Sequence, residues 1–130
     1  ELFADALASL PIDRTRLSLY GMSMGSFAVW DILARYPHTF AAAVVAAGCG
    51  SPSSAAAIAD VPVQIFHGTA DGAVPFESAV RMRDALIAAG DPEVKFTAFG
   101  GAGHGIWVRT ADTDGLYDWL FRQKRKEPNA

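Results

Sequence analysis

The sequence predicts an α/β fold, a parallel sheet with helices on both faces. Residues 40–47 and 61–67 are largely apolar without alternation, as strands are when helices cover both faces of a parallel sheet. Segments with helical spacing of apolar residues alternate with the strands, an order typical of right-handed crossovers. A length of 130 residues and a hydrophobic fraction of 51% suit one domain with its own core, so we treat residues 1–130 as a single domain.

The first third of the chain predicts a helix, a strand and a second helix. Apolar residues within residues 2–10 recur at helical spacing, and the pattern stops at Pro11. Residues 17–20 form a short β-leaning run that ends at a glycine. Residues 26–36 predict a helix that is apolar around most of its circumference, as expected for a helix packed on a sheet, and Pro37 closes it.

The middle of the chain predicts two buried strands and a helix. Residues 40–47 form the first buried strand, and residues 48–60 are the one loop-like stretch of any length. Residues 61–67 form the second buried strand. The next helix begins at Pro75, a residue suited to a first helical turn, and ends before Gly90, a natural cap.

The last elements complete the sheet and cover it. Residues 94–99 predict an edge strand, because Lys95 and Thr97 stand between apolar residues. A glycine-rich loop follows, and Leu116 and Leu120 mark a final amphipathic helix. The expected sheet therefore has about four strands.

Composition and charge exclude several classes of function. Eleven Lys and Arg against fourteen Asp and Glu give a net charge of −3, which offers no basic face for nucleic acid or an anionic membrane. No apolar run reaches the roughly 18 to 20 residues of a membrane span. The single cysteine, Cys49, has no partner for an internal disulfide, so the cellular compartment is left open.

A Gly-Met-Ser-Met-Gly pentapeptide, residues 21–25, lies between a predicted strand and a predicted helix. That is the context in which G-x-S-x-G forms a nucleophile elbow, a turn so tight that Ser23 must adopt a strained backbone. The Ser23 hydroxyl would then stand at the carboxyl end of the sheet. The N–H of Met24, at the helix start, would face a developing oxyanion. A plain glycine-rich turn is the alternative.

A serine hydroxyl needs a neighbouring base, and His104 is the candidate. It lies in the glycine-rich loop after the last strand, at the same sheet end as Ser23. His38 follows a proline and is expected at the surface. His67 precedes every suitable acid, so we expect a structural role for it, bonding the loop that follows.

Asp71 is the candidate acid, since it follows the strand at residues 61–67 and again lies at the carboxyl end of the sheet. Its role would be to hold the tautomer of His104 and to stabilise the imidazolium. Asp60 precedes a strand and Asp91 follows a helix, which puts both at the opposite end. Glu77 is expected in the first turn of its helix.

Three segments carry a resemblance to a known family: residues 21–31, 67–75 and 103–107. With them the sequence resembles an α/β-hydrolase, and within that superfamily the prolyl-oligopeptidase-related esterases and predicted peptidases. The resemblance implies Ser23 as nucleophile and, in line with the reasoning above, an aspartate acid and a histidine base. One departure is Ser26, which stands where relatives often have a second glycine and is expected to crowd the elbow without abolishing it.

The resemblance covers the C-terminal half of the α/β-hydrolase fold. Nothing here corresponds to the family's first four strands, which supply a second oxyanion-hole N–H and one wall of the acyl pocket. The strand at residues 17–20 would then be an exposed apolar edge, which natural proteins avoid. We therefore expect either a segment missing on the N-terminal side or a second copy of the chain to cover that strand.

The sequence thus predicts a metal-independent serine hydrolase without a cofactor, acting on small-molecule carboxylic esters. Only residues 48–60 are available where relatives insert a cap domain, so none is expected, and short acyl or polymer-linked esters are favoured. Trp107 either lines the substrate site or packs under the histidine loop. Two alternatives stay open: a serine peptidase of the prolyl-oligopeptidase type, and a non-catalytic half-domain that binds a partner through its open edge.

Overall fold

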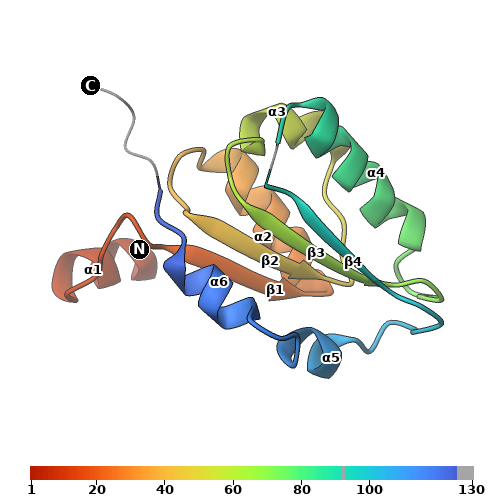
Figure 1. Ribbon diagram of the computed structural model, residues 1–130. Helices are drawn as coiled ribbons and strands as arrows, with labels where there is room; N and C mark the ends of the chain where they lie inside the picture. Colours follow the sequence, from red (N-terminus) through yellow and green to blue (C-terminus); the bar gives the residue numbers. More distant parts are fainter. Residues whose placement is uncertain (92, 126–130) are drawn as a thin grey trace.

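The computed structural model describes residues 1–91 and 93–125. Within them, four parallel strands form one sheet in the order β1-β2-β3-β4 (Figure 1). The strands are β1 (Ser18–Met22), β2 (Ala42–Ala46), β3 (Val63–Gly68) and β4 (Lys95–Phe99). The predicted α/β class and the parallel sheet are confirmed, including β4 as an edge strand that pairs with β3.

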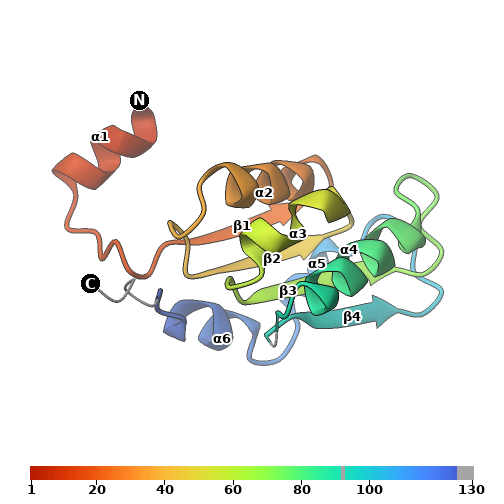
Figure 2. The same ribbon diagram turned by 90° about the horizontal axis from the view of Figure 1, so that it is seen from above.

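Helices cover both faces of the sheet (Figure 1, Figure 2). The helices on one face are α2 (Met24–Arg35), α3 (Ala55–Ile58) and α4 (Phe76–Ala88). Those on the other face are α5 (Trp107–Ala111) and α6 (Leu116–Arg122). Successive side chains of a strand point to opposite faces, so each central strand feeds two separate cores.

The central strands show why their sequences lack alternation. Every residue of β2 and β3 is buried. Ala43 and Val45 of β2 pack with the core under α2 and α4, whereas Ala42 and Val44 pack with the core under α6. Apolar side chains are therefore needed on both faces of these strands, as the sequence predicted.

The first helix, α1 (Leu2–Ser9), stands apart from this body (Figure 2). None of its residues is buried, and Leu2 is 85% exposed. Its Phe3 ring lies 6.2 Å from the ring of Phe40, measured between centroids. The predicted helix at residues 2–10 exists, but its apolar face is left largely uncovered among the described residues.

The local structure differs from expectation in three places. Residues 48–60 are not a plain loop, since they contain a short 3-10 helix, η1 (Pro52–Ser54), and α3. The helix α5 was not anticipated, because it is only five residues long and directly follows a glycine-rich stretch. The helix expected at residues 26–36 begins two residues earlier, at Met24, because the turn is completed at Ser23.

The outer edge of β1 carries no strand in the part of the chain that the structure describes. Beside this edge, β1 and α6 border an apolar groove of about 350 Å³. Tyr20 and Tyr117 stack across it with centroids 6.2 Å apart, and Tyr117 stacks in turn on Phe121. Burial, with Tyr117 close by, raises the pKa of Tyr20 to about 12.

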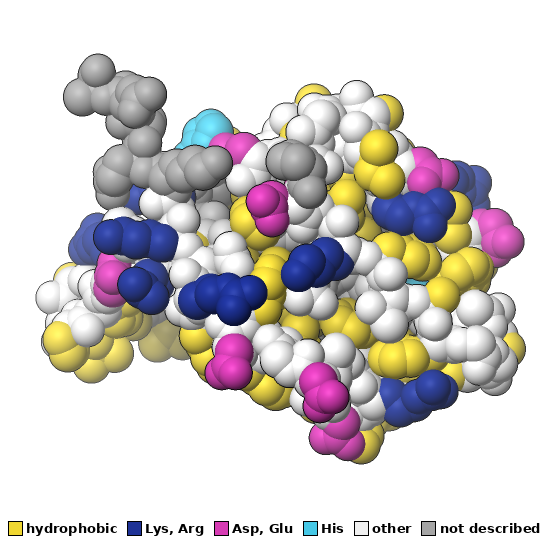
Figure 3. Space-filling model, viewed as in Figure 1, with side chains coloured by type: hydrophobic (Ala, Val, Ile, Leu, Met, Phe, Trp, Pro, Cys, Tyr) yellow, Lys and Arg dark blue, Asp and Glu magenta, His cyan; other side chains and the backbone are white. Residues whose placement is uncertain are grey.

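Both signs of charge occur on the face that carries α5 and α6. Figure 3 shows a row of Lys and Arg side chains across this face, with Asp and Glu side chains above and below it. Among the helices that the structure describes, none is long and apolar enough to cross a lipid bilayer.

Candidate active site

Ser23 lies at the junction of β1 and α2, as the pentapeptide predicted. Its φ of 51° and ψ of −117° are a strained combination for a residue with a side chain. Gly21 makes the turn possible, because a Cβ there would lie 2.3 Å from the carbonyl oxygen of Gly25. A Cβ on Gly25 would meet nothing within 4 Å, so of the two flanking glycines only Gly21 is required for steric reasons.

Ser26 is fully buried near Ser23, and it does not crowd the elbow. Its Oγ accepts a hydrogen bond from the N–H of Ala46 at 2.9 Å and lies within donating distance of two carbonyl oxygens, at 2.6 Å for Ala46 and 2.8 Å for Gly21. Space for it comes from Gly48, whose added Cβ would lie 2.4 Å from the Cβ of Ser26. Apart from the serine itself, no sequence pattern predicts this tie between α2 and β2.

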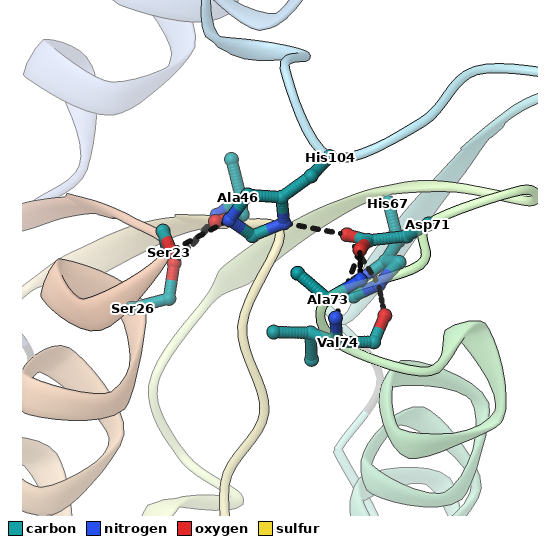
Figure 4. Close-up of polar contacts among 8 residues, drawn as sticks. All are labelled: Ser23, Ser26, Ala46, His67, Asp71, Ala73, Val74 and His104. Atoms are coloured by element: carbon teal, nitrogen blue, oxygen red, sulfur yellow. Dashed lines mark hydrogen bonds and ion pairs between the residues drawn. The ribbon is translucent and has the colours of Figure 1, made fainter.

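The three predicted catalytic side chains meet at one end of the sheet (Figure 4). The Nε2 of His104 lies 2.7 Å from Oγ of Ser23. The Nδ1 of the same ring lies 2.8 Å from Oδ2 of Asp71. A carboxylate can only accept, so Nδ1 carries the hydrogen and Nε2 is left to accept the proton of Ser23.

The Asp71 side chain is fully buried, whereas that of His104 is 28% exposed. The Oδ1 of Asp71 accepts hydrogen bonds from the N–H groups of Ala73 and Val74, both at 2.8 Å. Burial alone would raise the pKa of this carboxyl, but the N–H of Val74, the His104 ring and the N–H of Ala73 outweigh burial and hold the pKa of Asp71 below its usual value. Asp71 is therefore ionised at neutral pH.

The loops that carry Asp71 and His104 are hydrogen-bonded to each other. The N–H of Ala70 donates to the carbonyl of Ala102 at 2.9 Å, and the N–H of Gly101 donates to Oγ1 of Thr69 at 2.8 Å. The close approach of these two loops depends on Gly68, because a Cβ there would lie 2.3 Å from the carbonyl oxygens of Ala102 and Gly103. Sequence reasoning missed this role of Gly68.

Met24 and Trp107 border the same site. Met24 is the first residue of α2, and the first N–H groups of a helix have no carbonyl partner within the helix. The N–H of Met24 can therefore face a ligand. Trp107 begins α5, and its ring stands edge-on to that of His104, with centroids 6.2 Å apart. Trp107 is 46% exposed, and its ring also lies against Gly105 of the histidine loop, where an added Cβ would be 3.8 Å from it.

The other histidines and acids lie where they were expected. His38 is at the surface and pairs with Asp60 at 2.9 Å. Asp60 and Asp91 line a cavity of about 400 Å³ near the starts of β3 and β4, away from the triad. His67 is buried, and its Nε2 lies 2.9 Å from the carbonyl oxygen of Val74 in the loop that follows.

No group of three or more His, Cys, Asp or Glu side chains arranged to hold a metal ion occurs within residues 1–91 and 93–125.

The family model described as the dienelactone hydrolase family matches residues 3–124. The chain belongs to the dienelactone hydrolase family. Among solved structures, a thermostable esterase has a TM-score of 0.91 and 30% identity, covering 95% of this chain and 35% of that one. Esterase PE8 has a TM-score of 0.75 and 22% identity, covering 91% of this chain and 56% of that one. Acyl-protein thioesterase 2 of Zea mays has a TM-score of 0.68 and 26% identity, covering 90% of this chain and 59% of that one.

This member of the dienelactone hydrolase family spans between about a third and three fifths of the length of those solved structures, at 35% to 59%. An acylaminoacyl peptidase shares the fold at a TM-score of 0.77 and 16% identity. The predicted resemblance to α/β-hydrolases, esterases and peptidases of the prolyl-oligopeptidase type included, is confirmed. A search of the curated proteins finds no match.

Proposed function

We propose that this chain is a serine hydrolase of carboxylic esters, with Ser23 as nucleophile, His104 as general base and Asp71 as acid. One observation carries the proposal: the hydrogen-bonded line from Oγ of Ser23 to Nε2 of His104 at 2.7 Å, and from Nδ1 to Oδ2 of Asp71 at 2.8 Å. These distances are those of a nucleophile and its base within hydrogen-bond reach, with the base oriented by a third group.

In the first half of the reaction, Ser23 Oγ attacks the ester carbonyl carbon while His104 Nε2 takes the hydroxyl proton. The tetrahedral intermediate collapses when the bond to the alkoxy oxygen breaks, and Nε2 returns the proton to the leaving alcohol. Water then attacks the acyl-enzyme, with His104 again taking and returning one proton. Asp71 keeps Nδ1 protonated throughout and stabilises the imidazolium.

The oxyanion of the tetrahedral intermediate would be held by the N–H of Met24. This N–H is the first of α2, a helix of 12 residues whose dipole favours negative charge at its amino end. Donors fixed before reaction in this way are worth about 10² to 10³ in rate each.

Several features support an ester substrate that is short in its acyl part or attached to a polymer. Two of the structural neighbours are named esterases, and the 30% identical one covers 95% of this chain. In place of a cap, residues 48–60 hold two short helices. His104 and Trp107 are partly exposed, so a bulky ester can reach Ser23, and Trp107 would form one wall for the substrate.

The ester proposal is tested by assaying short p-nitrophenyl esters beside peptide p-nitroanilides. We expect turnover of the esters, and Ser23→Ala should lower kcat by about 10⁴ or more. Activity on the anilides alone would support the serine peptidase instead. A folded chain inactive on both would support a non-catalytic half-domain.

We also propose that the free edge of β1 is covered in solution, by a second copy of the chain or by a preceding segment. The apolar groove beside this edge supports the proposal, because such edges promote pairing when left bare. Light scattering on the purified chain should give a dimer if a second copy covers the edge. A monomer whose β1 amides exchange rapidly with deuterium would contradict coverage by a second copy. A preceding segment would then be the covering element, and the β1 amides of a longer chain that includes it should exchange slowly.

A further inference from the structure

A second histidine lies behind the catalytic acid and has no role in the steps above. His67 is fully buried on β3. Its Nε2 lies 2.9 Å from the carbonyl oxygen of Val74 and 3.3 Å from Oδ2 of Asp71 (Figure 4). That carboxylate oxygen is the same one that accepts from His104. Two imidazole rings therefore meet at one atom of the acid.

The hydrogen-bond partners assign the tautomer of His67. The carbonyl of Val74 can only accept, so Nε2 carries the hydrogen. The other ring nitrogen, Nδ1, is buried and has no hydrogen-bond partner. A doubly protonated ring would bury a second N–H with no acceptor, which is costly. His67 is thus a neutral ring whose one N–H donates to Val74, and the same Nε2 lies 3.3 Å from Oδ2 of Asp71.

The Asp71 carboxylate accepts three hydrogen bonds and has one further polar contact. Ala73 and Val74 donate to Oδ1, His104 donates to Oδ2, and Nε2 of His67 lies 3.3 Å from the same Oδ2. The three bonds, together with the His67 ring against Oδ2, hold the carboxylate in one orientation. Among the described residues, the hydrogen bonds and ion pairs of Asp71 reach two titratable groups, His67 and His104.

The ring of His67 is itself held on a rigid element. It stands edge-on to the ring of Phe76 in α4, with centroids 6.0 Å apart, and its backbone pairs with Ala98 of β4. The side chain has no exposed surface, so it cannot touch a substrate. Any effect of His67 on the reaction must pass through Asp71.

We propose that His67 is a positioning residue that fixes Oδ2 of Asp71 toward His104 and shares the charge of the carboxylate. The inference rests on the proposed function of the triad. Without the N–H of His67, the carboxylate would attract the proton of the His104 ring more strongly, and the imidazolium would persist to higher pH. A base that stays protonated is unable to activate Ser23.

Three variants separate positioning from a purely structural role. His67→Leu removes the donor, and His67→Gln places an amide N–H at the reach of Nε2. Ile65→Val, on the same strand and face, disturbs packing without touching Asp71. We expect His67→Leu to lower kcat about tenfold at neutral pH with KM unchanged, because the variant lacks the polar contact with the charged carboxylate.

The pH profile is the decisive readout. In His67→Leu the acid limb of kcat/KM should move to higher pH by about half a unit, whereas His67→Gln should restore kcat and the limb toward those of the wild type. Ile65→Val should lower Tm and leave the limb in place. If His67→Leu does not fold, His67→Asn takes its place, because the shorter Asn amide does not reach the position of the His67 Nε2. The acid limb of His67→Asn should then move to higher pH in the same way.

A second readout does not depend on activity. The proton between Nδ1 of His104 and Oδ2 of Asp71 should give a downfield proton NMR signal, and this signal should move in His67→Leu but not in Ile65→Val. A moved signal in a protein that cleaves no ester would uphold the positioning and contradict the proposed function. Folded His67→Leu with an unmoved signal, an unmoved acid limb and wild-type kcat would overturn the inference.

Discussion

The Oγ of Ser26 lies 2.9 Å from the amide nitrogen of Ala46, and this hydrogen bond joins the start of α2 to the end of β2. The carbonyl oxygen of Ala46 in turn accepts from the N–H of Ser23 at 2.8 Å. One residue of the neighbouring strand thus holds both Ser23 and the serine three positions later. The strained backbone of Ser23 is fixed from outside its own turn, as strained residues at functional sites require.

Ser26→Ala should therefore destabilise the fold. The N–H of Ala46 would lose its bond to a buried oxygen, and an unmade buried hydrogen bond costs about 1 to 3 kcal/mol. Urea unfolding measures the loss. Ser53→Ala, at an exposed serine, is the matched control and should change stability by less than about 0.5 kcal/mol. Equal stabilities of the two variants would show that the tie to β2 contributes nothing.

Alanine substitutions at the two glycines of the elbow should change the stability of the fold in opposite directions. Gly21→Ala places a methyl group 2.3 Å from the carbonyl oxygen of Gly25, so strand and helix must separate, and we expect a loss of about 3 kcal/mol or more, or no folded protein. Gly25→Ala meets nothing and lies in α2, where alanine should stabilise by up to about 1 kcal/mol. Thermal unfolding of both variants checks this, and similar Tm values would be inconsistent with the geometry of the turn.

Trp107 should affect substrate binding more than stability. Its ring is nearly half exposed and stands beside His104, so Trp107→Ala should raise KM for aryl esters by about five- to tenfold, the worth of one aromatic contact. Trp107→Phe should recover part of the loss. Val108→Ala, one residue along and also exposed, should leave KM unchanged. An unchanged KM in Trp107→Ala would remove this residue from the substrate site.

Asp91 should make stability depend on pH. It is 5% exposed, its Oδ2 has no hydrogen-bond partner, and burial, with the charges of Glu93 and Asp60, raises its pKa despite the N–H of Glu93. A raised folded pKa means that ionisation opposes folding, so the penalty is absent at low pH and complete above the folded pKa.

Asp91→Asn should consequently raise Tm at pH 7 by about 3 °C. The gain should vanish below about pH 3.9, where the unfolded carboxyl is protonated too. Asp114→Asn, at an exposed carboxyl, provides the control in calorimetry at both pH values. A gain in Tm that is the same at acid and neutral pH would contradict the assigned role of burial.

Sequence reasoning reached the triad because each member follows a strand, and the carboxyl ends of parallel strands meet. It identified Ser23 from the pentapeptide, and Asp71 and His104 from chain order and their loops after strands, and the structure brings these three side chains together. It could not find α5, whose single turn and a half carries too few apolar positions for a period to emerge. Nor could it find Gly68 or the second contact of His67, because those depend on distances between loops.

The central claim is that Ser23 is activated by His104, and covalent labelling tests it most directly. A fluorophosphonate probe should add to the wild-type chain, with the adduct mapped by mass spectrometry to Oγ of Ser23. His104→Gln should slow the labelling by about 10³ or more while the chain stays folded. Labelling of folded wild-type protein at another residue, or none at all, would contradict the claim.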